Sequence, residues 1–347
     1  MPYLVRENLF IGNITDAAEV LQGRGEMGIT HVLSVLSSPS ISFFSEWKTG
    51  FAIPTREIET VRRDDDKILY VVEEAGEGLT RMGVGVRDME SENLLDHLED
   101  CLDFIDKSRK EGSVLVHCFA GVSRSAAVVT AYLMRSERLS REDALESLKQ
   151  SCEFVCPNDG FLDQLKMFEE MGFAVDRSSP IYKRFHLKVL GDSYNRGEKI
   201  DSSKFGVDPG VPTETPGLVG ASPADKKGRS TGYRCKKCRR VVALQENVID
   251  HIPGEGEASF SWKKRNSGNP RNKSDDSECS SIFVEPLRWM SAVEEGALEG
   301  KLQCAHCEAR LGYFNWSGIQ CSCGSWITPA FQIHKGRVDV STVEQCC

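Results

Sequence analysis

Apolar residues recur along the first 175 positions with two different spacings. Continuous apolar runs at 31–36 and 114–116 are typical of buried strands. Between residues 94 and 105, apolar side chains recur every three or four positions, which predicts a helix with Ser91 as its N-cap and Gly112 after its end. Strands that alternate with helices predict an α/β fold with a central sheet flanked by helices. Further helices are predicted near 125–137, 141–150 and 159–171.

Less regular segments surround these elements. Residues 4–12 alternate weakly and predict one or two short strands, and Thr15 or Asp16 is expected to cap a short helix. Residues 37–85 contain Ser/Pro turns, an acidic run and several glycines, so we expect strand pieces inside a loop-rich insertion. Ligands of α/β sheets bind at the carboxyl ends of the strands. The strand that ends at His117 is therefore the first place to look for a site.

Length and composition indicate how the chain is divided. A chain of 347 residues favours two domains over one. We expect a catalytic domain at 1–175, a partly ordered linker at 176–230 that is rich in Ser, Gly, Pro and Asp, and a metal-binding domain at 231–340. Within the linker, residues 181–190 could also dock on the first domain. No apolar run approaches ~20 residues, so no membrane partner is expected.

Charge and cysteine content separate the two halves further. Residues 1–175 carry 18 Lys/Arg against 31 Asp/Glu, a net charge of −13, whereas residues 176–347 carry 25 against 21, a net charge of +4. The basic half is therefore the one expected to meet nucleic acid. The 13 cysteines accompany an N-terminus without the apolar core of an export signal, which favours metal binding or catalysis over disulfides.

The motif from His117 to Ser125 has the form His-Cys-x-x-Gly-x-Ser-Arg-Ser. Five residues separate Cys118 from Arg124, and this spacing wraps a short loop so that its backbone N–H groups point at one centre before a helix. Such a loop suits a phosphate dianion, and the same field stabilises a thiolate. Arg124 can hold two phosphate oxygens at once. The predicted phosphate-binding residues are His117, Phe119, Ala120, Gly121, Val122, Ser123 and Arg124.

This loop predicts nucleophilic catalysis in which Cys118 attacks phosphorus and forms a phosphocysteine. A general acid must protonate the leaving oxygen and a base must then activate water; Asp88, thirty residues upstream, is expected to do both. Ser125 is expected to donate a hydrogen bond to the sulfur, and His117 to order the loop from below. No catalytic cofactor is needed. Three acidic residues compete with Asp88 for its role, namely Glu90, Asp64 and Asp66.

Paired cysteines predict metal sites in residues 231–340. Thiolate and imidazole ligands select zinc, and eight of them are enough for two tetrahedral ions with no open catalytic position. We therefore expect two structural zinc ions that the small domain needs in order to fold. Of the ligands, Cys304, Cys307, Cys321 and Cys323 form the firmest set, a cross-braced pairing stays open, and His306 and His334 are rivals. The eight predicted ligands are Cys235, Cys238, His251, Cys279, Cys304, Cys307, Cys321 and Cys323.

The motif from His117 to Ser125 resembles the signature of cysteine-based protein phosphatases. Three further stretches, at 8–12, 28–33 and 157–165, are similar to the dual-specificity branch of that family. The resemblance covers about residues 3–172 and implies a shallow cleft that admits phosphoserine and phosphothreonine as well as phosphotyrosine of phosphoprotein substrates. The segment 37–85 departs from it, being longer than a compact member needs.

The C-terminal part resembles the zinc domain of dual specificity phosphatase 12-type proteins, through residues 285–290, 304–307, 311–316 and 321–335. This resemblance implies a second, non-exclusive function: an assembly factor of the large ribosomal subunit that acts through its zinc domain, in the cytoplasm and nucleus. Residues 224–274 hold 13 Lys/Arg against 5 Asp/Glu, with Tyr233, Phe260 and Trp262 among them. Basic residues interleaved with aromatic ones suit RNA or the pre-ribosomal large subunit. The alternative for this segment is a solvated linker.

Overall fold

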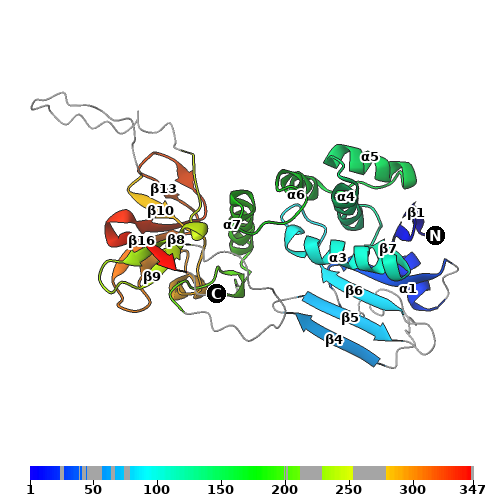
Figure 1. Cartoon of the computed structure of the whole chain (residues 1–347), viewed down its shortest axis with the longest axis horizontal. Coiled ribbons are helices and arrows are strands. Elements are labelled where there is room, and N and C mark those ends of the chain that lie inside the picture. Colours follow the sequence, from blue (N-terminus) through cyan, green and yellow to red (C-terminus); the bar gives the residue numbers. More distant parts are fainter. Residues whose placement is uncertain are drawn as a thin grey trace, which may run out of the picture. The chain divides into compact units, whose positions relative to one another are not determined.

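The computed structural model divides into two compact units, Met1–Tyr182 and Lys183–Cys347 (Figure 1). Each unit has its own hydrophobic core. Asp64, Asp66, Phe260 and Trp262 lie outside the described residues. The residues that the structure describes are 1–23, 27–38, 40, 44, 57–63, 67–73, 79–198, 200, 202–211, 229–252 and 279–344.

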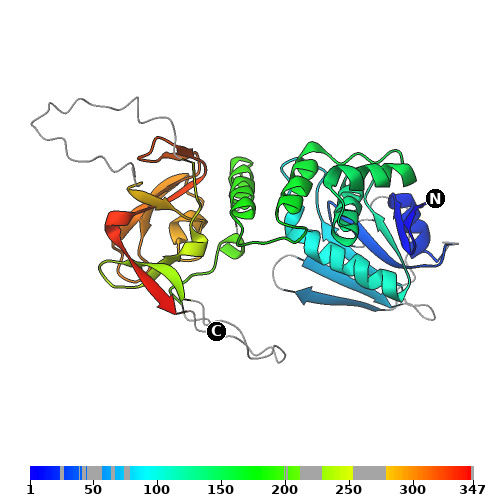
Figure 2. The ribbon, with the colours of Figure 1, turned by 45° about the horizontal axis from the view of Figure 1, so that its top comes forward.

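The first unit is built on a seven-stranded sheet with the order β1-β2-β7-β3-β6-β5-β4. The inner strands β2, β7, β3 and β6 run parallel, and β1, β5 and β4 pair antiparallel at the two sides. Helices α3 to α6 pack on one another (Figures 1 and 2). This is the predicted α/β fold with a central sheet flanked by helices. Its elements are β1 (Tyr3–Arg6), β2 (Leu9–Gly12), α1 (Ile14–Leu21), β3 (Ile29–Leu36), β4 (Glu57–Arg63), β5 (Lys67–Glu73), β6 (Thr80–Gly85), α3 (Leu95–Glu111), β7 (Ser113–His117), α4 (Arg124–Glu137), α5 (Arg141–Ser151) and α6 (Asp159–Glu170).

Strand β7 lies between β2 and β3 and contains the predicted apolar run 114–116. Leu115 packs with Ile14 and Leu21 of α1, whereas β7 also contacts α3 and α4. Successive side chains of a strand point to opposite faces, so β7 is covered on both. Its carboxyl end carries His117 and the loop that follows to the edge of the sheet where ligands bind.

The N-terminus of α3 differs from the prediction, because Ser91 is not its cap. The side-chain oxygen of Gln164, which is 1% exposed, accepts hydrogen bonds from the backbone N–H groups of Leu94 (2.8 Å) and Leu95 (3.2 Å). Helix α1 is capped by Asn13, just before the residues predicted for that role. Asn93 also accepts from the backbone N–H of Asp96 at 3.1 Å, so α3 has a local cap as well, two residues after the predicted one. Asn13 likewise satisfies the usual N-cap preference.

Residues 37–85 contribute strands to the sheet. Strands β4 and β5 form an antiparallel hairpin, and β5 pairs with β6, so the sheet continues beyond β3. The prediction of strand pieces in this region is confirmed by these three strands.

The second unit consists mainly of short antiparallel strands (Figure 2). They form a four-stranded sheet β10-β15-β12-β11, a three-stranded sheet β16-β8-β9 and the pair β13-β14. Trp316, Phe314 and Phe331 lie in its core. Its elements are α7 (Pro180–Asn195), η1 (Ser202–Lys204), β8 (Arg229–Cys235), β9 (Val241–Leu244), η2 (Gln245–Asn247), β10 (Ser281–Phe283), α8 (Ser291–Glu294), β11 (Glu299–Gln303), β12 (Arg310–Asn315), β13 (Ile319–Gln320), β14 (Trp326–Ile327), β15 (Ala330–His334), η4 (Lys335–Arg337) and β16 (Val338–Glu344).

The boundary between the units differs from the predicted end of the first domain at residue 175. Most of the predicted linker's first part is helix α7, and the division falls after Tyr182. Leu187 and Leu190 belong to the core of the second unit, whereas Tyr182, near the start of the same helix, lies in the first unit and donates a hydrogen bond to Asp96 of α3. The alternative that residues 181–190 dock on the first domain therefore holds only for the beginning of the helix. Burial of these two leucines explains why a segment next to a polar, Gly-rich stretch is helical. None of the helices in the described parts has the length and apolar character needed to cross a membrane.

Candidate functional site

The loop after β7 surrounds the sulfur of Cys118, whose residue is 1% exposed. The backbone N–H of Gly121 and the hydroxyl of Ser125 both donate hydrogen bonds to this sulfur, each at 3.2 Å. The structure thus brings Cys118 and Ser125 together as the sequence predicts.

Gly121 lets the loop close tightly. Its φ is +78°, and a Cβ at this position would lie 2.9 Å from the carbonyl oxygen of Gly12. Any side chain would meet both a strained backbone and the end of β2, which is why glycine is needed here. The loop is also tied to its neighbours through the carbonyl of Phe119, which accepts from Ile14 N–H at 3.1 Å, and the carbonyl of Val122, which accepts from Cys156 N–H at 2.8 Å.

Arg124 begins α4 and is held beneath the loop, with 7% of its surface exposed. One of its terminal nitrogens donates to the Val86 carbonyl at 3.2 Å. Its Nε is buried without a hydrogen-bond partner among the described residues and lies 3.7 Å from Asp88 Oδ2. A guanidinium held at one end with an unused donor on the other side is placed to clamp a phosphate oxygen.

Asp88 lies beside the loop on the segment that follows β6. Its Oδ1 accepts hydrogen bonds from Ser123 Oγ (2.7 Å) and Asn158 Nδ2 (2.9 Å), which leaves Oδ2 as the freer oxygen. The carboxyl group is partly exposed, at 39%. Of its rivals, Glu90 is exposed and makes no such contact with the loop. The structure therefore brings Asp88 to the predicted catalytic loop.

His117 lies at the base of the loop and is completely buried. Its Nδ1 faces the Cys118 carbonyl at 3.1 Å, and its Nε2 faces Ser34 Oγ at 2.7 Å. A carbonyl can only accept, so Nδ1 carries the proton, Nε2 accepts from Ser34, and Ser34 accepts in turn from Arg81 Nε at 2.9 Å. Burial lowers the pKa of His117 to about 3, so the ring stays neutral.

Three residues that hold the site were missed by the sequence reasoning. Ser34 and Arg81 are both 0% exposed and orient His117 from β3 and β6. Asn158 connects the loop of Asp88 to α6, since its side chain donates to Asp88 while its backbone N–H donates to Ser123 Oγ at 3.1 Å. A polar residue inside an apolar strand run, such as Ser34, was the signal that could have drawn attention to this network.

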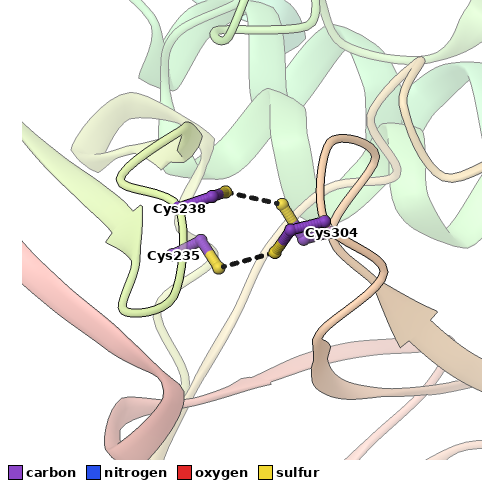
Figure 3. A group of neighbouring side chains, drawn as sticks. Cys235, Cys238 and Cys304 are labelled. Atoms are coloured by element: carbon purple, nitrogen blue, oxygen red, sulfur yellow. Dashed lines mark hydrogen bonds between the residues drawn. The ribbon is translucent and has the colours of Figure 1, made fainter.

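The first candidate metal centre brings together Cys235 and Cys238 with Cys304 and Cys307. Figure 3 shows Cys235 and Cys238 on one loop facing Cys304 on another. The sulfurs of Cys238 and Cys304 are 3.5 Å apart, and those of Cys235 and Cys307 are 3.7 Å apart. Four thiolates at about 2.3 Å from one zinc ion have neighbouring sulfurs about 3.8 Å apart, so the donor set and spacing fit zinc.

The second candidate metal centre consists of His251, Cys279, Cys321 and Cys323, whose ligand atoms lie within 4.8 Å of one another. The Nε2 atom of His251 lies 3.4 Å from the Cys279 sulfur and 3.3 Å from that of Cys323. A nitrogen and sulfurs around one tetrahedral zinc ion are expected about 3.6 Å apart. The two rivals are absent from both groups: His306 is exposed, and His334 contacts Ser281 Oγ at 3.1 Å instead.

Each of the three cysteine pairs lies in a tight turn that a backbone hydrogen bond closes. The N–H of the first cysteine in two of them donates to a carbonyl five residues later, Cys235 to Arg240 and Cys304 to Ala309, each at 2.9 Å. The residue after each pair, including Gly324, has a positive φ of 57° to 88°. This shared backbone form presents both sulfurs of a pair on one side.

The grouping of the eight ligands is interleaved along the chain. One centre combines Cys235 and Cys238 with the pair at 304 and 307. The other centre combines His251 and Cys279 with the pair at 321 and 323. The set from Cys304 to Cys323, the firmest in the sequence, is thereby divided between two centres, and the cross-braced alternative describes the structure. Both centres supply four protein ligands, which leaves no position for a substrate.

Comparisons with known proteins agree with this geometry. The family description "Dual specificity phosphatase, catalytic domain" matches residues 55–171. The chain is 42% identical over 264 residues to dual specificity protein phosphatase 12 of Rattus norvegicus, covering 76% of this chain and 75% of the relative. It is 37% identical over 336 residues to the protein of that name from Mus musculus, covering 96% and 87%. It is 32% identical over 339 residues to tyrosine-protein phosphatase YVH1 of Saccharomyces cerevisiae, covering 95% and 89%.

The chain belongs to the dual specificity protein phosphatase 12 family. It is accordingly a dual-specificity protein phosphatase, and the loop of Cys118 and Arg124 lies within the matched catalytic domain. The site of this phosphatase combines a buried cysteine, an arginine with an unused donor and a carboxyl group that is partly open to solvent. Those three parts are what transfer of a phosphoryl group to a thiolate requires.

Proposed function

We propose that this phosphatase hydrolyses phosphotyrosine, phosphoserine and phosphothreonine in proteins through a phosphocysteine intermediate. The observation that carries the proposal is the sulfur of Cys118, which accepts two hydrogen bonds at the centre of the loop and lies beside Asp88. A site held this way offers a thiolate to the phosphorus atom from one side while the carboxyl group reaches the leaving oxygen.

In the first step, the Cys118 sulfur forms a bond to phosphorus as the bond to the substrate oxygen breaks. Asp88, in its protonated form, gives its proton to that oxygen and becomes a carboxylate. In the second step, the Asp88 carboxylate takes a proton from water, which attacks phosphorus and releases inorganic phosphate and the thiolate. Ser125 stabilises the departing sulfur through its 3.2 Å hydrogen bond. Arg124 holds the phosphate oxygens in both steps.

We further propose that both candidate metal centres hold zinc. Thiolate and imidazole donors prefer this ion, and the measured ligand separations suit its tetrahedral geometry. When bound, each zinc ion joins segments that are distant in the sequence and stabilises the second unit. The ions take no part in phosphate hydrolysis, because each centre is closed by four protein ligands.

A second candidate function is binding to the pre-ribosomal large subunit or to RNA through the second unit. The observation in its favour is the pair formed by Arg310 and Tyr313, whose guanidinium carbon lies 4.0 Å from the ring centroid on β12. Such a pair can stack on a base. Part of the basic segment serves the fold instead, since Arg239 pairs with Asp339 and Arg240 with Asp208.

The experiment that tests the proposed phosphatase mechanism compares wild type with Cys118→Ser on phosphotyrosyl and phosphoseryl peptides. Zinc content is measured on the same samples. We expect wild type to hydrolyse both peptides, Cys118→Ser to hydrolyse neither, and both proteins to hold two zinc ions. Hydrolysis by Cys118→Ser would refute the phosphocysteine. Activity on phosphotyrosine alone would refute the broader specificity. Fewer than two zinc ions would refute the metal assignment.

A further inference from the structure

Three loops meet around Cys118 and form the mouth of the site. They are the phosphate loop itself, residues 86–93 and residues 152–160. Cys156 N–H donates to the carbonyl of Val122 at 2.8 Å, which joins the third loop to the first. A Cβ on Gly160 would lie only 2.1 Å from the carbonyl oxygen of Glu90, which shows how closely the second and third loops pack. The mouth is therefore a surface held together by direct contacts.

Each of the three loops exposes one large apolar side chain. Met89, directly after Asp88, is 41% exposed; Phe119, directly after Cys118, is 44% exposed; and Phe154 is 60% exposed. Within the described residues of the first unit, the other exposed large hydrophobic side chains are confined to positions 1–27. Apolar groups left exposed around a phosphate-binding loop have the position of contacts for the residues that flank a phosphorylated side chain.

The mouth carries a net negative charge, whereas a phosphate group attracts positive charge. Residues 86–93 contain Arg87 against Asp88, Glu90 and Glu92, a formal net charge of −2 that becomes −1 while Asp88 holds the proton for the leaving oxygen. Residues 152–160 contain Glu153 and Asp159 without Lys or Arg, a net charge of −2. Arg87 is used by Glu92, 2.7 Å away. Glu90, Glu153 and Asp159 are exposed. Beyond the buried Arg124, these loops offer no unused cation to a second negative group.

We infer that this site selects singly phosphorylated segments whose flanking residues are apolar or basic, and that it disfavours acidic flanks and a second nearby phosphate. The inference rests on the proposed hydrolysis of phosphoproteins and names the class of substrate for that same site. The phosphate itself is held by the loop N–H groups and the buried Arg124. Flanking side chains stay at the rim, where Met89, Phe119 and Phe154 offer apolar contact and the carboxylates repel negative charge.

The test uses the full chain and phosphopeptides that share one central phosphoresidue and differ in their flanks, which are Leu, Lys, Gly or Glu. We expect kcat/KM for the Leu and Lys peptides to exceed that for the Glu peptide by about tenfold, the Gly peptide lying between them. Phe154→Ser is expected to lower the advantage of Leu over Gly by about threefold through KM, with hydrolysis of a small aryl phosphate unchanged. Glu153→Lys is expected to raise kcat/KM for the Glu peptide up to about fivefold.

Two matched controls keep the test specific. Leu4→Ser removes an apolar side chain that is 59% exposed on β1, and Glu146→Lys reverses an exposed charge on α5, both outside the three loops. Neither control is expected to change the order of the peptides. Equal kcat/KM for all four peptides, or equal effects of Phe154→Ser and Leu4→Ser, would overturn the inference.

Binding of the same peptides to Cys118→Ser separates this inference from the proposed function. If wild type fails to hydrolyse any peptide, the proposed function fails, and the order of the dissociation constants decides the inference alone. Tighter binding of the Leu and Lys peptides than of the Glu peptide then supports it. Equal dissociation constants overturn it.

Discussion

Replacing Ser34 by alanine removes the hydroxyl that connects Arg81 to His117. The hydroxyl oxygen accepts from the Nε–H of Arg81 at 2.9 Å, and the O–H donates to His117 Nε2 at 2.7 Å. All three residues are 0% exposed. Alanine leaves one buried donor and one buried acceptor without this partner. Each such loss costs about 1–3 kcal/mol, so the free energy of unfolding of the first unit should fall by about 2–6 kcal/mol.

The assay is calorimetric unfolding of the full chain, followed by kinetics on a small aryl phosphate. For a unit of this size, about 1 kcal/mol shifts the transition by about 2–4 °C, so we expect its midpoint to fall by at least about 4 °C. Because the freed ring of His117 no longer fixes the Cys118 carbonyl, kcat should fall as well.

Ser108→Ala is the matched control for this substitution. The Ser108 hydroxyl is equally buried, at 0% exposure, but has no hydrogen-bond partner among the described residues. Its removal takes away a buried hydroxyl without a partner in the described part of the chain, so the midpoint should stay the same or rise. If Ser34→Ala and Ser108→Ala shifted the transition equally, the chain of hydrogen bonds through Ser34 would contribute nothing beyond the burial of a hydroxyl, and the reasoning would be refuted.

Three further predictions concern the acid, the metals and pH. Asp88→Asn keeps an oxygen for Ser123 but cannot supply a proton, so kcat on a phosphoseryl peptide should fall about 10²–10⁴-fold, and less on an aryl phosphate with a good leaving group; equal losses on both would argue against the acid. Cys235→Ser combined with Cys307→Ser should cost one zinc ion, whereas Cys235→Ser with Cys321→Ser should cost two, as measured by metal analysis; the reverse result would contradict interleaving. Burial lowers the pKa of His117 from 6.5 to about 3, so between these pH values the unfolded chain binds one more proton than the folded chain. The free energy of unfolding therefore decreases by about 1.4 kcal/mol for each unit by which the pH is lowered in this range. The slope of unfolding free energy against pH should be shallower by that amount in His117→Gln, and an unchanged slope would exclude this histidine as the cause.

The phosphate loop was predictable from the sequence because its parts are close together along the chain. Strand, loop and helix follow one another from residue 113 to 137, and the spacing of Cys118 and Arg124 already contains the geometry. The candidate metal ligands in the three cysteine pairs were predictable for a similar reason, since each of these pairs forms its own turn. Spacing along the sequence is enough to identify these side chains, but it does not show which of them lie together in the fold.

What escaped the sequence reasoning depends on contacts between distant residues. Ser34 and His117 are 83 positions apart, and Gln164 caps α3 from 70 positions away. Such contacts follow from the order of the strands and the docking of α6, which no single segment encodes. The pairing of the metal ligands has the same origin, because the antiparallel strands of the second unit decide which turns face each other.

The interleaved ligands also set an order of events during synthesis of the chain. When Cys279 has left the ribosome, the nascent protein carries half of the ligands of each candidate metal centre and no complete set. The first centre can close only after Cys307 emerges, and the second only after Cys323. Chains cut short before these positions would hold loosely bound metal on incomplete ligand sets and would remain unfolded in this part. Complete loading of both candidate centres with the proposed zinc ions would thus be a chemical mark of a finished protein.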